Sequence, residues 1–139
     1  MTDTDALLDA AARVAANSYS PYSQFRVGSA ILDSRGEVHV GTNVENASYG
    51  LTICAERSAV FGMVAESVSA SSESGAGRII AVAVWVDAPE PVSPCGACRQ
   101  VLTEFGNPDT EVILGCSAGG RRDVTLGELL PDPFSDLTL

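Results

Sequence analysis

Three cysteines and one glutamate have types and a spacing that could support metal-dependent chemistry. Cys54 and Glu56 flank one alanine, and Cys95 and Cys98 form a Cys-x-x-Cys pair about forty residues further along the chain. Three thiolates supply three of the four ligands of tetrahedral Zn²⁺, and a structural site normally adds a fourth. No fourth ligand stands nearby, but a carboxyl group does. We therefore expect Zn²⁺ with an open coordination position beside an acid/base group, as in a zinc hydrolase.

Both cysteine segments lie where we expect helices to begin. The unpaired N–H groups at a helix N-terminus carry roughly half a positive charge, which favours thiolate over thiol. Three thiolates on one Zn²⁺ still leave a net negative charge, and Arg57 and Arg99 directly follow the two segments. We expect Arg57 to donate hydrogen bonds to the cysteine sulfurs and so to offset part of that charge.

Helices and strands alternate along the chain. We expect helices at 3–17, 54–67 and 95–105, strands at 25–32, 37–40, 79–86, 111–114 and 121–124, and a capping box at 125–128 that opens a last helical turn. In the first helix we expect Thr2 or Thr4 as the N-cap and an apolar stripe of Leu8, Ala11, Ala12 and Ala15. The alternation predicts an α/β fold, with a mixed sheet of about five strands covered by helices in three layers.

Two stretches of the chain are expected to be loops. Residues 41–51 read as a polar loop, and the serine-rich stretch 67–77 as a mobile one. The strand at 79–86 is a near-continuous apolar run, which is typical of a strand buried on both faces.

Length and composition bound the class of protein. The 139 residues, 45% of them hydrophobic, are enough for one domain covering 1–139. No apolar run approaches the ~20 residues that span a bilayer, and the N-terminus has no basic signal pattern. We therefore expect a cytoplasmic protein without a membrane partner, in which the four cysteines are ligands or free thiols.

The charge balance indicates the kind of partner. The chain has 8 Lys+Arg against 18 Asp+Glu and a net charge of −10. Nucleic-acid binding draws most of its affinity from basic residues on phosphates, so we expect no nucleic-acid partner. A neutral small molecule fits this composition better.

Two non-hydrolytic interpretations of the cysteines, a structural zinc site and a redox pair, remain open at this point. A structural zinc site could recruit His39 or Cys116 as its fourth ligand, although we expect His39 to be exposed in its strand and Cys116 to be a small buried hydrophobe. A thioredoxin-like redox pair would explain Cys-x-x-Cys, but it would need neither Cys54 nor Glu56.

The chain resembles the small cytidine deaminases of the zinc nucleoside and nucleobase deaminase superfamily over nearly its whole length. The matching segments are 20–23 (SPYS), 25–30 (FRVGSA), 42–50 (TNVENASYG), 53–57 (ICAER), 93–102 (SPCGACRQVL), and 128–131 (ELLP) with Phe134. Cys54 in place of histidine resembles the short-chain, all-cysteine branch. This resemblance implies a homotetramer with active sites at subunit junctions and a place in pyrimidine salvage.

The resemblance also implies a role for each site residue. Glu56 takes a proton from the attacking water, protonates ring N3 and passes a proton to the leaving ammonia. The remaining implied roles are zinc binding by Cys54, Cys95 and Cys98, packing of Phe25 on the pyrimidine, hydrogen bonds from Asn43 and Glu45 to ribose hydroxyls, base contacts from the backbone around Ala55, and positions at or near a neighbouring subunit's pocket for Ala47, Tyr49 and Phe134. Pro133, just before Phe134, departs from the family pattern and affects how that ring is presented.

The implied reaction converts cytidine and 2′-deoxycytidine to uridine and 2′-deoxyuridine with release of ammonia. The charge of Glu45 would repel a nearby 5′-phosphate, so we expect the monophosphate to be a poor substrate. The alternatives are a blasticidin-type aminonucleoside deaminase and a non-enzymatic structural zinc-binding domain. A polynucleotide deaminase would need a basic, aromatic groove, which the acidic composition disfavours.

Overall fold

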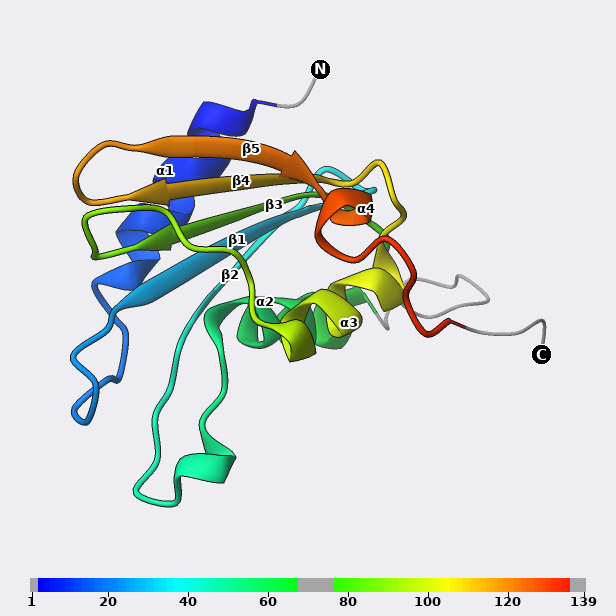
Figure 1. Ribbon diagram of the computed structural model, residues 1–139. Coiled ribbons are helices and arrows are strands. Elements are labelled where there is room, and N and C mark those ends of the chain that lie inside the picture. The colour runs from blue at the N-terminus through cyan, green and yellow to red at the C-terminus, as the bar shows by residue number, and fades with distance from the viewer. Residues whose placement is uncertain (1–2, 68–76, 136–139) are drawn as a thin grey trace.

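A computed structural model describes residues 3–67 and 77–135, so most of the serine-rich stretch expected to be a loop lies outside the described residues. Within them, five strands form one sheet in the order β2-β1-β3-β4-β5 (Figure 1). β3 and β4 run parallel and the other neighbours antiparallel. The strands are β1 (Val27–Asp33), β2 (Val38–Thr42), β3 (Ile79–Val86), β4 (Glu111–Cys116) and β5 (Arg121–Thr125). The predicted mixed sheet is confirmed.

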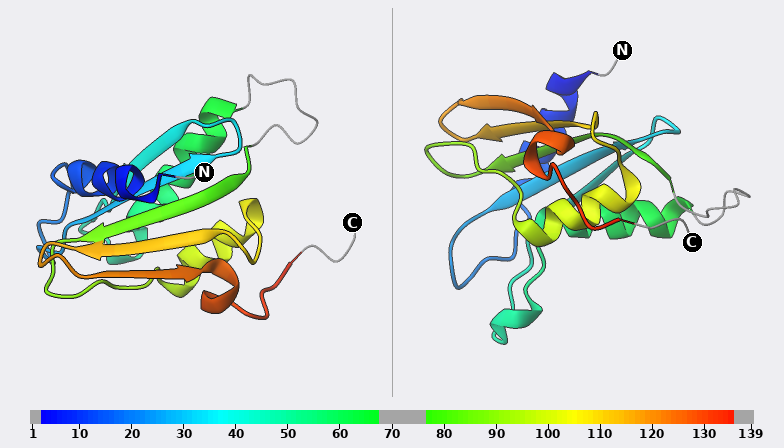
Figure 2. Two further views of the ribbon diagram at one scale, coloured as in Figure 1. Left: turned by 90° about the horizontal axis from the view of Figure 1, so that it is seen from above. Right: turned by 45° about the vertical axis from the view of Figure 1, so that its right-hand side comes forward.

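Helices cover both faces of the sheet, which confirms the three-layer α/β fold (Figure 2). Helix α1 (Thr4–Ala15) packs on one face, where Leu7 and Ala11 meet Ala30, Ala81, Ala83 and Ile113. Helices α2 (Ala55–Ser67) and α3 (Gly96–Phe105) pack on the other, over the larger cluster of buried side chains. The short helix α4 (Leu126–Leu129) follows β5 and has the predicted capping box at Thr125 and Glu128.

One glycine allows α2 to approach the sheet closely. A Cβ added at Gly41 of β2 would lie 2.5 Å from the backbone nitrogen of Ala59 and 2.7 Å from the carbonyl oxygen of Ala55. Any larger residue would therefore push the first turns of α2 away from β2. This contact matters for chemistry because Cys54 directly precedes α2 and Glu56 lies in its first turn.

The cap and the buried face of α1 differ from expectation. Asp3 is the N-cap, with its side chain accepting a hydrogen bond from the backbone N–H of Ala6 at 3.0 Å. The buried residues are Leu7, Ala11 and Ala15, whereas Leu8 and Ala12 are only partly buried. Residues four apart lie on one helix face, so this set makes a narrower stripe than the predicted one.

The expectation that His39 is exposed is wrong. His39 is 3% exposed and points toward α2, while its neighbours Val38 and Val40 are exposed on the other face of β2. His39 Nε2 lies 2.9 Å from Asp33 Oδ2, and Nδ1 lies 3.1 Å from Glu66 Oε2. A buried polar side chain is tolerated when it has such partners, and the strand alternation then places the two valines in solvent.

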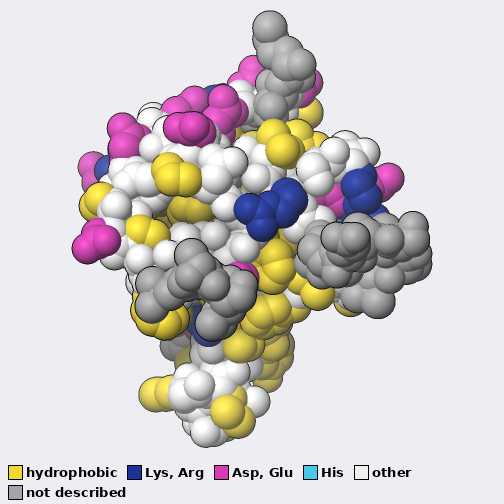
Figure 3. Space-filling model, turned by 90° about the vertical axis from the view of Figure 1, so that its right-hand side faces the viewer, with side chains coloured by type: hydrophobic (Ala, Val, Ile, Leu, Met, Phe, Trp, Pro, Cys, Tyr) yellow, Lys and Arg dark blue, Asp and Glu magenta, His cyan; other side chains and the backbone are white. Residues whose placement is uncertain are grey.

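The segment expected to be a polar loop at 41–51 has structure of its own. β2 continues to Thr42, and Tyr49–Leu51 forms a 3₁₀ helix, η1. Residues 43–53 project from the body of the molecule at the bottom of Figure 1. Figure 3 shows hydrophobic side chains gathered over the lower part of one face, with acidic ones mainly in its upper part.

Candidate active site

Three sulfurs converge where α2 and α3 begin. The Sγ atoms of Cys54, Cys95 and Cys98 all lie within 4.8 Å of one another, and those of Cys54 and Cys95 are 3.8 Å apart. Tetrahedral Zn²⁺ with Zn–S bonds of about 2.3 Å separates its sulfurs by about 3.8 Å, so the residues present fit the ion. Within the described part of the chain, this group contains three ligand side chains and no fourth.

Local structure places each ligand. Cys54 follows an antiparallel bridge between Val44 and Ile53, which closes the base of the projecting segment and delivers the chain to α2. Cys95 is the N-cap of α3, and its sulfur accepts a hydrogen bond from the backbone N–H of Cys98 at 3.4 Å. Both ligand segments therefore sit at helix N-termini, as expected, and the positive ends of two helix dipoles stabilise thiolate charge.

The candidate fourth ligands for a structural zinc site have other partners. His39 is bound to Asp33, as described above, and the Cys116 sulfur donates toward the carbonyl oxygens of Pro89 and Gly120. Neither belongs to the sulfur cluster. Cys116 is buried, as predicted.

Arg57 contacts the metal-binding cluster. Its Nη2 donates a hydrogen bond to Cys54 Sγ at 3.3 Å. The pKa of Cys54 is lowered to about 5, chiefly by a hydrogen bond from Cys98 and further by Arg57, against burial, which raises it. The pKa of Cys98 is raised, because its thiol is the partner that donates to Cys54 and because it is buried.

Glu56 is a buried acid at the same place. Its side chain is 4% exposed, and its pKa is raised to about 7, first by burial and next by the negative charge of Cys54, with Arg57 opposing. A carboxyl group that titrates near neutral pH can act as a base and then as an acid in one reaction.

A cavity of about 290 Å³ lies over these groups. Its wall includes Cys54, Glu56 and Cys95, and no lysine or arginine. The other lining residues are Ser23, Phe25, Val27, Asn43, Glu45, Thr52, Ile53, Ala55, Val84, Val92 and Ser93. An apolar wall with a few polar groups is typical of a small-molecule site, and this volume lies at the lower end of the usual range.

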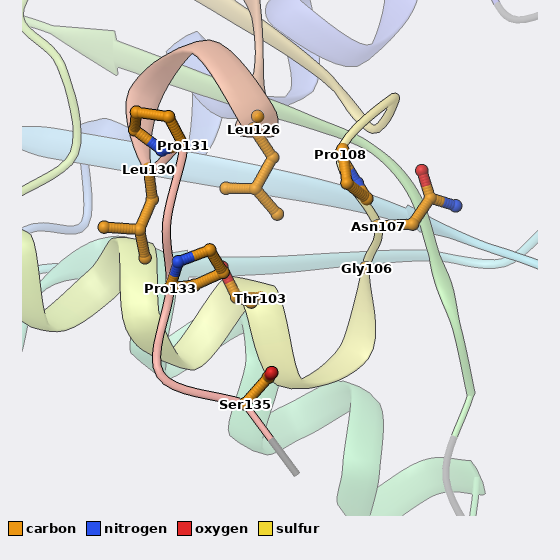
Figure 4. Close-up of a pocket in the computed structure, with 10 residues that line it drawn as sticks. Thr103, Gly106, Asn107, Pro108, Leu126, Leu130, Pro131, Pro133 and Ser135 are labelled. Carbon is orange, nitrogen blue, oxygen red and sulfur yellow. The ribbon is translucent and has the colours of Figure 1, made fainter. Parts of the chain in front are cut away.

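A second cavity, of about 300 Å³, has no comparable chemistry. It lies between the end of α3, α4 and the C-terminal segment, and Figure 4 shows Pro108, Pro131 and Pro133 around it. No titratable side chain lines it. The cavity beside the sulfur cluster is therefore the candidate active site.

A known family matches most of the chain, including the residues of this site. Residues 1–116 match the model described as "Cytidine and deoxycytidylate deaminase zinc-binding region". The chain belongs to this family. The predicted zinc cofactor is thus confirmed for the family, and the three cysteines form a cluster able to hold a metal ion.

Similar proteins cover nearly all of this chain. A cytidine deaminase of Halalkalibacterium halodurans is 44% identical over 133 residues, which make up 96% of this chain and 95% of that protein. The crystal structure of a cytidine deaminase from Burkholderia pseudomallei is 45% identical, covers 96% of this chain and 100% of its own, and has a TM-score of 0.81. The cytidine deaminase structure from Mycobacterium tuberculosis has 38% identity, a TM-score of 0.77, and covers 97% and 99%.

The fold brings most of the predicted site residues together. Phe25, Asn43, Glu45 and Ala55 line the cavity with Glu56 and two of the cysteines. Tyr49 does not line it; with Tyr22, it borders an adjoining hollow that shares Ser23, Glu45 and Thr52 with the cavity. Ala47 and Phe134 line neither hollow.

Sequence reasoning assigned no role to Ser23 or Gly41. Ser23 belongs to one of the segments that carry the resemblance, and a serine next to a predicted binding segment was the available signal. Gly41 acts only through the approach of a helix that is distant in sequence. Within residues 3–67 and 77–135, no helix has the length and hydrophobicity needed to cross a membrane.

Proposed function

We propose that this chain catalyses the zinc-dependent hydrolytic deamination of cytidine and 2′-deoxycytidine to uridine and 2′-deoxyuridine, a step of pyrimidine salvage. The observation that carries the proposal is the position of Glu56. This acid is buried in the wall of the cavity, directly beside a cluster of three sulfurs that fits Zn²⁺. Family membership and relatives named cytidine deaminase support the choice of reaction.

The residues divide the chemistry between them. Cys54, Cys95 and Cys98 would hold Zn²⁺, which when bound supplies a Lewis acid that makes water a competent nucleophile near neutral pH. Glu56 takes a proton from the attacking water and delivers it to ring N3. As a new C4–O bond replaces the C4–N bond, the same carboxyl group takes the proton of the hydroxyl group on C4 and passes it to the leaving nitrogen, which departs as ammonia. Arg57 offsets the charge of the thiolates.

The rest of the cavity selects the nucleoside. Phe25 packs on the pyrimidine, and the backbone around Ala55 contacts the base. Asn43 uses its side-chain oxygen to accept from Val27 N–H and Ser18 Oγ–H and one amide hydrogen to bond the Phe25 carbonyl, which leaves one N–H for a ligand. Glu45 contributes only acceptors. A donor and an acceptor of this kind suit the hydroxyl groups of ribose.

Assembly and location belong to the same proposal. Tyr49 is 74% and Phe134 80% exposed, and such large exposed rings favour a subunit interface. With Ala47, they are proposed to border a neighbouring subunit's pocket in a cytoplasmic homotetramer of single-domain chains covering 1–139. Gln100 Nε2 donates to the Phe134 carbonyl oxygen at 2.8 Å, which anchors the backbone after Pro133. Light scattering should give four chains per particle, and a fully active monomer would refute this part.

One paired assay tests the reaction. The purified protein should convert cytidine to uridine, followed as a loss of absorbance, and should contain one zinc per chain. Glu56→Gln should keep the zinc and lose activity by several orders of magnitude, while Glu104→Gln, an exposed change on α3, should leave both unchanged. A structural zinc protein would show no turnover in either form, and a blasticidin-type enzyme would turn over the aminonucleoside and not cytidine.

A further inference from the structure

The carboxylate of Glu45 is held by the loop that follows α1. Oε1 accepts hydrogen bonds from the backbone N–H groups of Tyr22 at 2.9 Å and Ser23 at 3.1 Å. The Ser23 hydroxyl donates to Oε2. Three donors from two consecutive residues thus fix one side chain on the wall of the cavity. They also lower the pKa of Glu45, with the Ser23 hydroxyl as the main cause, so the group stays an anion and an acceptor.

The same hydroxyl also holds the backbone of Phe25. Ser23 Oγ accepts a hydrogen bond from the Phe25 N–H at 2.9 Å. On its other side, the Phe25 carbonyl oxygen accepts from Asn43 Nδ2 at 2.7 Å. The aromatic residue is therefore tied through one hydroxyl to Glu45 and directly to Asn43.

The loop adopts a strained conformation to make these contacts. Gln24, between Ser23 and Phe25, has φ of 56°, and it is the only non-glycine residue with positive φ among those the structure describes. A left-handed residue of this kind is unfavourable and persists only where its surroundings hold it. Here the Gln24 N–H donates to the Ser20 carbonyl at 2.9 Å, and its side chain donates to the Pro21 carbonyl at 2.8 Å. The strain is located where the loop aims Ser23 at Glu45.

We propose that Ser23 is a positioning residue that sets sugar specificity, because its hydroxyl couples the carboxylate that binds the sugar to the aromatic residue that packs on the base. This inference rests on the proposed function. The Ser23 hydroxyl bonds both the Glu45 carboxylate and the Phe25 N–H, so it holds the sugar-binding group and the base-packing residue in one fixed arrangement. Without the hydroxyl, the Glu45 carboxylate keeps its two backbone donors, so the loop retains its shape while the link between sugar and base is lost.

The test compares ligands with and without the sugar hydroxyls. Dissociation constants of the zinc-loaded protein for uridine and 2′,3′-dideoxyuridine are measured by calorimetry, and kcat/KM for cytidine and 2′,3′-dideoxycytidine by absorbance. The ratio between the members of each pair measures how much the hydroxyls contribute. Ser23→Ala should lower both ratios by tenfold or more, and Ser23→Thr, which keeps a hydroxyl, should restore them.

The control is Ser20→Ala in the same loop, since the Ser20 hydroxyl contacts Ser18 and not Glu45. It should leave both ratios at the wild-type value. A purely structural role would make Ser23→Ala weaken both members of each pair equally, and unchanged ratios would overturn the proposal. If the wild-type protein turns over cytidine while the Ser23→Ala ratios do not move, only the role of Ser23 is wrong. If it neither turns over cytidine nor binds uridine, the proposed function and this inference both fail.

Discussion

Arg57 and Cys54 are joined across the first turn of α2 by a hydrogen bond of 3.3 Å from a guanidinium nitrogen to a ligand sulfur. The contact places a positive charge against a cluster that would carry three negative charges as thiolates. It also holds the Cys54 side chain in place in the absence of the metal.

Arg57→Gln should therefore weaken zinc binding by about 10–100-fold, as expected when a partner of a metal ligand is removed. The rate of zinc release to a chromophoric chelator measures this. Arg57→Lys, which keeps the charge and loses the planar group, should release zinc faster than the wild type and more slowly than Arg57→Gln. Unchanged zinc release and turnover in Arg57→Gln would refute the role of this arginine.

A 5′-phosphate should make a poor substrate. The cavity wall contains Glu45 and Glu56 and no basic side chain, so a phosphate dianion would meet repulsion without compensation. We expect kcat/KM for CMP to be at least about tenfold below that for cytidine. The difference should narrow at higher salt, because dissolved ions screen the charge of the Glu45 carboxylate. Equal kcat/KM for CMP and cytidine would contradict this explanation, and it would favour the deoxycytidylate side of the family.

Gly41 is a spacing residue whose effect should reach the metal. Its added Cβ would collide with backbone atoms of α2, so Gly41→Ala should lower the free energy of unfolding by about 1–3 kcal/mol. Because α2 follows Cys54 and carries Glu56, zinc affinity should fall as well. Gly62→Ala is the matched control, since a Cβ there meets nothing within 4 Å. Urea titration and zinc analysis of both variants measure these two effects. If Gly41→Ala behaved like the control, the prediction would be wrong.

Asp33 should contribute stability that acid removes. Burial raises its pKa, but hydrogen bonds from His39, from Arg35 and from the backbone N–H groups of Glu37 and Arg35 outweigh this and lower the pKa to about 2. A lowered pKa stabilises the fold above the unfolded value of about 3.8, and this contribution is lost as the pH falls toward 2. Its size is about 2 kcal/mol.

Asp33→Asn should therefore cost about 2 kcal/mol at pH 7, and the difference from wild type should shrink below about pH 4. Urea unfolding at fixed protein concentration measures it, with exposed Asp9→Asn as the control. A difference that stays constant from pH 7 to pH 3 would rule out this assignment.

The success of sequence reasoning depended on how local the cause was. The bounds of β3 and the capping box at Thr125 follow from short-range patterns, and the structure has both. The clustering of Cys54, Cys95 and Cys98 could be predicted because ligand types and helix starts are local as well.

The features that the sequence did not predict come from contacts between distant segments. The burial of His39 depends on a carboxylate from the preceding strand and on α2, which the alternation of β2 alone does not predict. The relay through Ser23 depends on a loop folding back on Glu45, 22 residues away in the sequence. Such contacts follow from the tertiary structure and leave no periodic pattern.

The central claim is that the metal has three sulfur ligands and one position left for chemistry. X-ray absorption at the zinc edge of the freshly purified protein tests it directly. We predict three sulfur neighbours at about 2.3 Å and one lighter neighbour at about 2.0 Å, with no imidazole pattern. Four sulfurs, a bound imidazole or a protein without zinc would contradict the account.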